Sequence, residues 1–201
     1  EYYPSLAAIA QQGLNKRGSA VGKELVNPTY IVLDVPSPMA EWIRAMRARF
    51  DEERSLLPAE ITLTGSCGTG FLSPGQSFET ITACLQKAAA QIEPFYAEFG
   101  NVERFENTDI YFLNLIDNTP FFRAHEIVSN CGLRFEPSPY PFHPHCTLKL
   151  RKPPRDLQEL LELFLLQAPR HPFRLDLLSL YSLPSPDTCD LIYKIELGSR
   201  L

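Results

Sequence analysis

The chain has 201 residues, of which 44% are hydrophobic and 21% charged. This composition supports an ordinary soluble core in one domain or two closely packed lobes. It excludes coiled coil, collagen and wholesale disorder, and no apolar stretch is long enough to span a membrane. Its 19 Lys and Arg against 24 Asp and Glu give a net charge of −5. This charge argues against binding of long nucleic acid through many phosphates, but it permits binding of a single phosphate or of a short nucleic-acid end.

The cysteines and the N-terminal segment bear on location and domain organisation. Five cysteines are widely spaced and form no Cys-x-x-Cys pair, which favours a reduced, cytoplasmic setting. Residues 1–28 contain no apolar run of signal-peptide length and no suggestive group of polar residues. We therefore expect an N-terminal appendage over 1–28 and one bilobal domain over 29–201.

The first part of the chain predicts two strands, each followed by a helix. A strand over 30–35 ends at Pro36, after which a Ser-Pro pair begins a helix whose buried stripe ends at Phe50. A strand over 60–67 then leads through a Gly-rich loop to a helix over 78–92.

The second part predicts further strands that alternate with two helices. Runs rich in aromatic and branched residues predict the strands 95–105, 110–116, 143–151, 173–183 and 191–197. The helices are expected over 118–132, where Gly132 closes the first of them, and over 157–165.

The order strand, helix, strand, helix occurs twice, from residue 30 to 92 and from 110 to 167. This order indicates an internal duplication. Because other strands pair by hairpins, we expect an α+β fold of two pseudo-symmetric lobes, with antiparallel sheets flanking a central cleft and helices outside. Clefts between lobes are favoured binding places.

Two segments that lie 85 positions apart carry polar residues in the same arrangement. In Glu60-Ile61-Thr62-Leu63, the alternation of a strand puts Glu60 and Thr62 on one face. In His145-Cys146-Thr147-Leu148, the same rule puts His145 and Thr147 on one face. The residues that extend this second face are His143, Lys149 and Arg151. Equivalent placement in the two halves would aim both polar rows into one cleft.

The paired segments resemble the signature of the two-histidine (2H) phosphoesterase superfamily, which includes 2′,5′ RNA ligase-like proteins and cyclic phosphodiesterases. Members carry a His-x-Thr-Leu strand in each lobe. Residues 145–148 resemble the second motif in full, and residues 60–63 resemble the first with its histidine replaced by Glu60. The resemblance extends from about residue 30 to the C-terminus and includes the late strand that contains Tyr181.

The resemblance implies metal-free acid-base chemistry on a 2′,3′-cyclic phosphate or a 2′,5′ linkage. One imidazole acts as base and the other as acid, which suits a side chain that titrates near neutral pH. Thr62 and Thr147 would hold the phosphoryl oxygens and His145 would be catalytic, with His143, Lys149 and Tyr181 as auxiliary candidates. The expected partner of this monomer is a nucleotide or short RNA end, without cofactor, resident metal or membrane.

Glu60 decides whether the chain is an enzyme. A carboxylate can act as a base opposite a His145 acid, and general acid-base catalysis contributes roughly 10² to 10⁴ in rate. Repulsion between a carboxylate and a phosphate about 4 Å apart reaches about 4 kcal/mol at an effective dielectric near 20, which can cancel that gain. The residues therefore leave two hypotheses: a phosphoesterase with a degenerate first motif and weak turnover, and an inactive nucleotide- or phosphate-binding module.

The same residues and their neighbours admit other interpretations. His143 and His145 have a metal-ligand spacing, with Glu60 as a third ligand. The Gly-rich loop lacks the Lys-Ser/Thr ending of a phosphate loop, so it predicts a turn. Three arginines on the first helix predict a solvated face: Arg44, Arg47 and Arg49.

Overall fold

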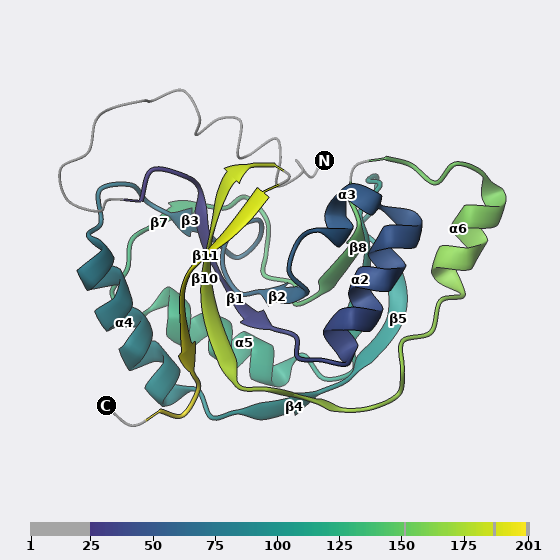
Figure 1. The fold of residues 1–201 in the computed structure, drawn as a ribbon. Coiled ribbons are helices and arrows are strands. Elements are labelled where there is room, and N and C mark those ends of the chain that lie inside the picture. The colour runs from purple at the N-terminus through teal and green to yellow at the C-terminus, as the bar shows by residue number, and fades with distance from the viewer. Residues whose placement is uncertain (1–24, 151, 187, 200–201) are drawn as a thin grey trace.

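The computed structural model describes residues 25–150, 152–186 and 188–199, and within them the strands form four antiparallel sheets (Figure 1). The largest sheet has the order β11 (Thr188–Glu196), β10 (Leu177–Ser185), β1 (Thr29–Asp34), β2 (Glu60–Thr62). A second sheet has the order β5 (Phe99–Arg104), β6 (Tyr111–Leu115), β8 (Cys146–Lys149). Two short pairs join β3 (Thr69–Leu72) to β7 (Phe135–Pro137) and β4 (Phe95–Ala97) to β9 (Phe173–Leu175). The predicted α+β class with antiparallel sheets is confirmed.

Five helices lie in the described ranges, and an N-cap side chain accepts a hydrogen bond from the first turn in three of them. They are α2 (Met39–Phe50), α3 (Glu52–Ser55), α4 (Phe78–Gln91), α5 (Thr119–Ser129) and α6 (Leu157–Phe164). Ser77 accepts a hydrogen bond from the backbone N–H of Thr80 to cap α4, and Asp156 caps α6 through the N–H of Glu159. No helix in the described ranges has both the length and the apolar character that crossing a bilayer requires.

The two halves of the chain build their sheets in the same way. In the first half β1 pairs with β2, and in the second half β6 pairs with β8, both antiparallel. Both β2 and β8 are edge strands of their sheets. The two motif segments therefore lie at, or immediately before, these two sheet edges, and side chains from both line one cavity.

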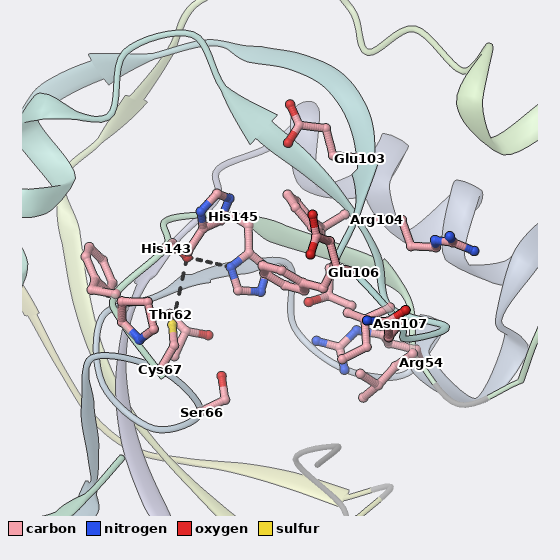
Figure 2. A pocket seen from close by; sticks show the side chains of 17 residues that line it. Arg54, Thr62, Ser66, Cys67, Glu103, Arg104, Glu106, Asn107, His143 and His145 are labelled. Atoms are coloured by element: carbon pink, nitrogen blue, oxygen red, sulfur yellow. Dashed lines mark hydrogen bonds between the residues drawn. The ribbon is translucent and has the colours of Figure 1, made fainter. Parts of the chain in front are cut away.

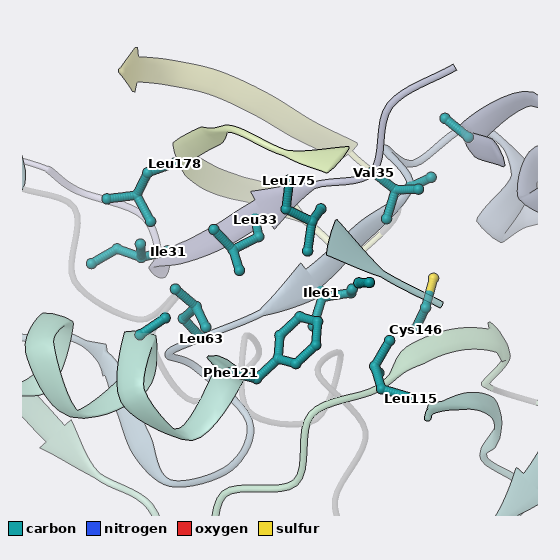
Figure 3. Close-up of a cluster of buried hydrophobic side chains, with 14 of the residues drawn as sticks. Ile31, Leu33, Val35, Ile61, Leu63, Leu115, Phe121, Cys146, Leu175 and Leu178 are labelled. Carbon is teal, nitrogen blue, oxygen red and sulfur yellow. The ribbon is translucent and has the colours of Figure 1, made fainter. Parts of the chain in front are cut away.

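Each connecting helix reaches across to the other half. In α5, which connects β6 to β8, His125 Nδ1 donates a hydrogen bond to the carbonyl of Leu63, 2.7 Å away, just after β2. In α2, which connects β1 to β2, Arg47 Nε donates to the carbonyl of Thr147 in β8 at 3.0 Å. Phe121 of α5 packs beside Ile61 and Leu63 in the continuous apolar core (Figure 3).

Arg47 does not belong to a solvated face, as its spacing with Arg44 and Arg49 predicted. Its side chain is fully buried, whereas the other two arginines are exposed. Besides the bond to Thr147, its Nη1 donates to the carbonyls of Leu57 at 3.2 Å and Pro58 at 2.8 Å. These three carbonyls lie on the two segments that form the cleft, so Arg47 joins β8 to the chain that enters β2.

The motif strands are shorter than predicted. The strand expected over 60–67 ends at Thr62, because the chain turns at Gly65, which has a φ of 133°. The strand expected over 143–151 is reduced to Cys146–Lys149, so His143 and His145 lie in the segment that precedes it.

Other predicted strands divide because the chain passes from one sheet to another. The strand over 95–105 becomes β4 and β5, and the strand over 173–183 becomes β9 and β10. The sequence did not predict the short elements α3, β3 and β7. Of the appendage expected over 1–28, residues 1–24 lie outside the described residues. Leu25 packs against the core.

Replacement of Arg47 by Met should destabilise the fold by about 3 kcal/mol, because it leaves two buried carbonyls and one half-buried carbonyl without their donor and each buried loss costs about 1–3 kcal/mol. Urea unfolding measures this free energy. The matched control is Arg44→Met, an exposed arginine on the same helix, which should change stability by no more than about 0.5 kcal/mol. Equal unfolding midpoints for the two variants would contradict this role of Arg47.

Candidate functional site

A cavity of about 480 Å³ lies between the two edge strands (Figure 2). Thr62 of β2 and Thr147 of β8 both line it, together with His143 and His145 from the segment before β8. Its rim comes from the hairpin of β5 and β6, over residues 103–110. Residues from both motif segments thus meet in one hollow.

His145 is held in one tautomer. Its Nδ1 lies 2.6 Å from the carbonyl oxygen of His143, so Nδ1 carries the hydrogen and donates it. The other ring nitrogen, Nε2, is then an unprotonated acceptor in the neutral ring. Phe105 and Phe112 pack against the imidazole, each with a centroid distance of 5.1 Å. Burial among these groups lowers the pKa of His145 to about 4, so the ring is neutral at pH 7.

The two motif threonines present free hydroxyl groups. Within the described residues, no protein group hydrogen-bonds the hydroxyl of Thr62 or of Thr147. The backbone of Thr147 is fixed by Arg47, and Thr62 pairs with Val32 of β1. Each hydroxyl can therefore donate to an anionic oxygen without breaking an existing bond.

Arg54 also lines the cavity, although the sequence analysis did not predict it as a site residue. It lies in α3, whose N-cap Asp51 accepts a hydrogen bond from the Arg54 backbone N–H at 3.3 Å and another from the N–H of Leu150 at 2.9 Å. This double contact places α3 against the end of β8. The Asp-x-x-Arg spacing was readable as a capped turn, but nothing in it indicated that Arg54 faces the cavity.

Glu60 lies beside the cavity and does not line it. Its side chain is 5% exposed and faces a smaller hollow that Tyr30 and Arg54 also line. The Tyr30 hydroxyl donates to Glu60 Oε1 at 3.1 Å, while Oε2 is buried without a hydrogen-bond partner among the described residues. Burial raises the pKa of Glu60, and the nearby Arg54 guanidinium lowers it less strongly.

Lys149 points away from the cavity because β8 contains a bulge. Thr147 pairs with Phe112, but Lys149 pairs with Tyr111, so one extra residue on β8 reverses the alternation. The Lys149 ammonium donates to the carbonyl of Phe50 at 2.6 Å and lies 3.9 Å from Glu159. Arg151, expected on the same face, lies outside the described residues.

The remaining predicted residues divide between the cavity and its surroundings. The ring of His143 lines the cavity, and burial lowers its pKa. Tyr181 does not line it, since its hydroxyl donates to Asp34 Oδ1 at 3.1 Å. The His143, His145 and Glu60 metal set does not form, because no three His, Cys, Asp or Glu side chains in the described ranges gather as metal ligands.

The cavity combines few charges with aromatic walls. Phe105, Phe112 and Phe142 line it, which offers flat surfaces for stacking. The exposed rim carries two carboxylates and one guanidinium from residues 103–106. Inside, a neutral imidazole, two hydroxyl groups and Arg54 can bind an anion and move one proton.

Comparison with known proteins gives a family and a fold. The family model of the 2′-5′ RNA ligase superfamily matches residues 35–185, more than half of the chain. LigT of E. coli complexed with 3′-AMP is similar with a TM-score of 0.60 and 16% identity, over 88% of this chain and 100% of that one. LigT complexed with NADP⁺ gives a TM-score of 0.59 and 17% identity over the same shares.

A protein from a second organism has a similar fold. TT0787 of Thermus thermophilus gives a TM-score of 0.55 and 18% identity, over 87% of this chain and 100% of that one. No curated protein matches the chain. At these identities the solved structures establish the shared fold.

Acid should destabilise the wild-type chain more than a His145→Asn variant. The pKa of His145 is about 4 in the folded chain and near 6.5 when unfolded, so the unfolded state takes up the proton first as the pH falls through this window. The free energy of unfolding should fall by about 3 kcal/mol more in wild type than in the variant between pH 7 and pH 4. Denaturant titrations at both pH values measure this difference.

The control for the pH experiment is His171→Asn, which removes an exposed histidine. Acid-induced changes at other groups, including the buried Glu60, cancel when each variant is compared with wild type. Identical pH dependence of wild type and His145→Asn would show that the His145 imidazole is not held neutral by the fold.

Proposed function

The chain belongs to the 2′-5′ RNA ligase superfamily, and on that premise we propose that its cavity binds the phosphate of a nucleotide or short RNA end carrying a 2′,3′-cyclic phosphate or a 2′,5′ linkage. The observation that carries this proposal is the convergence of two threonine hydroxyls and one unprotonated imidazole nitrogen on a single hollow. The setting we propose is a reduced one, consistent with five free thiols.

Phosphate binding follows from the types of donor that line the cavity. Hydroxyl groups donate to phosphoryl oxygens without adding charge, and a guanidinium adds charge-assisted bonds. The relatives of known structure give independent support, because LigT was solved with 3′-AMP and with NADP⁺. The aromatic walls provide a stacking surface for a base next to the phosphate.

His145 is the general base of the proposed reaction on a cyclic phosphate. Its Nε2 accepts the proton of an attacking water as the new P–O bond forms. The P–O bond to the ribose O2′ or O3′ then breaks, and the leaving oxygen takes up a proton. Because Nδ1 donates its hydrogen to the His143 carbonyl, Nε2 can accept the proton without rotation of the ring.

Turnover is slow in this proposal because, among the described residues, no second imidazole stands opposite His145 in the cavity. The residue at the corresponding position of the first motif, Glu60, contacts Tyr30 and faces the smaller hollow. Loss of general acid catalysis at the leaving oxygen costs roughly 10² to 10⁴ in rate. Binding through the threonines does not depend on that group.

Removal of either threonine hydroxyl should weaken binding of 2′,3′-cyclic AMP. Thr62→Val and Thr147→Val keep the shape of the side chain and delete one donor each, so each should raise Kd about 5- to 10-fold. Isothermal titration calorimetry at fixed salt measures Kd. Thr80→Val, on the exposed face of α4, is the control and should bind as wild type does. If wild type binds no cyclic nucleotide, the proposed function is wrong.

Hydrolysis of 2′,3′-cyclic AMP should be slow in wild type and lost in His145→Ala, because the imidazole that serves as base is removed. Glu60→Gln should retain the wild-type rate, because Glu60 does not line the cavity. Chromatographic detection of 2′-AMP or 3′-AMP over hours measures turnover. If Glu60→Gln still binds the nucleotide but no longer hydrolyses it, Glu60 is the working base and this mechanism fails.

A further inference from the structure

Arg54 is a buried cation that takes no part in the proposed acid-base step. The residue is 7% exposed, and its side chain lines the main cavity (Figure 2). It also lines the smaller hollow that Glu60 faces. The cap at Asp51 and the contact of Asp51 with Leu150 fix the short helix that carries it. Its position is therefore set by the fold.

The guanidinium of Arg54 lacks an ion-pair partner among the described residues, and its Nε is buried there without a hydrogen bond. Glu60 attracts it electrostatically but does not make an ion-pair contact. A buried charge normally pairs or coordinates a ligand, because desolvation without compensation costs several kcal/mol. An anion in the cavity would supply the missing partner.

We infer that Arg54 binds a phosphate oxygen in the cavity and makes the site selective for singly charged phosphodiesters, such as a cyclic phosphate, over doubly charged phosphomonoesters. This inference rests on the proposed function and adds the residue that sets the charge preference. It makes Arg54 a specificity-determining residue six positions before the first motif.

The charges around the cavity support a preference for one negative charge. Among the described lining residues, Arg54 is the cation inside, where its companions are the hydroxyls of Thr62 and Thr147 and the neutral ring of His145. Glu60, beside Arg54, opposes further negative charge. At the rim, carboxylates outnumber guanidinium groups: Glu103 and Glu106 against Arg104. A dianion therefore meets two guanidinium groups, Arg54 inside and Arg104 at the rim, against three carboxylates. The same preference would release a monoester product after ring opening.

Two variants of Arg54 test the contact. Arg54→Met should weaken binding of 2′,3′-cyclic AMP about 10- to 100-fold, because a charge-assisted hydrogen bond is lost. Arg54→Lys should show a smaller loss, because it keeps the charge without the planar fork. Arg44→Met removes an exposed arginine on α2 and is the matched control, with Kd unchanged.

Stability separates binding from a structural role. Without ligand, Arg54→Met should melt no lower than wild type, because a buried charge without an ion pair is removed. If Arg54→Met does not fold, the double variant Arg54→Met with Glu60→Gln removes both charges and serves in its place. A variant that folds and binds cyclic AMP as tightly as wild type would overturn the inference.

The charge preference is measured on the wild-type chain alone. At pH 8, where a phosphomonoester is a dianion, 2′,3′-cyclic AMP should bind at least about 10-fold more tightly than 2′-AMP and 3′-AMP. Equal or tighter binding of the monoesters contradicts the selectivity. Failure of wild type to bind any of the three nucleotides contradicts the proposed function itself, whereas unchanged binding by Arg54→Met contradicts only this inference.

Discussion

The hydrogen bonds of Arg47 hold together the two segments on which the candidate site depends. One side chain donates to a carbonyl of β8 and to two carbonyls of the chain that enters β2. Because each half of the molecule contributes one threonine, a shift of β2 relative to β8 would separate the two hydroxyls. The two sheets that flank the cleft are therefore held in place by the buried hydrogen bonds of Arg47, and α2 connects them.

The site is built from neutral donors around one cation. Burial keeps His145 neutral, the hydrogen bond to the His143 carbonyl fixes the tautomer that leaves Nε2 free, and the threonine hydroxyls carry no charge. An anion that enters such a hollow gains hydrogen bonds in a medium of low dielectric, where they are stronger than in water. In our proposal, charge selectivity rests on the few ionised groups, chiefly Arg54, and not on a broad basic surface, in agreement with the net charge of −5.

Sequence patterns predicted what depends on local alternation and failed where tertiary contacts decide. The period of two placed Thr62 and Thr147 on faces that do line one cavity. The same rule misplaced Lys149, because a bulge in β8 reverses the faces after Thr147. Arg47 was assigned to a solvated face from its charge, although it lies four residues after Ile43 and three before Phe50 on the buried face of α2. Arg54 depends on a four-residue helix that no periodicity could indicate.

The carboxylate at position 60 is consistent with the two buried arginines near it. Arg47 and Arg54 both act electrostatically on Glu60, and each is removed from solvent without a salt bridge in the described part of the chain. A histidine at this position would add a third basic group to the cluster, whereas a glutamate offsets part of the positive potential. Glu60 thus contributes to the electrostatic surroundings of Arg54. In the proposed function, phosphate recognition uses the threonines and the guanidinium and so does not depend on position 60, whereas acid catalysis at the leaving oxygen does.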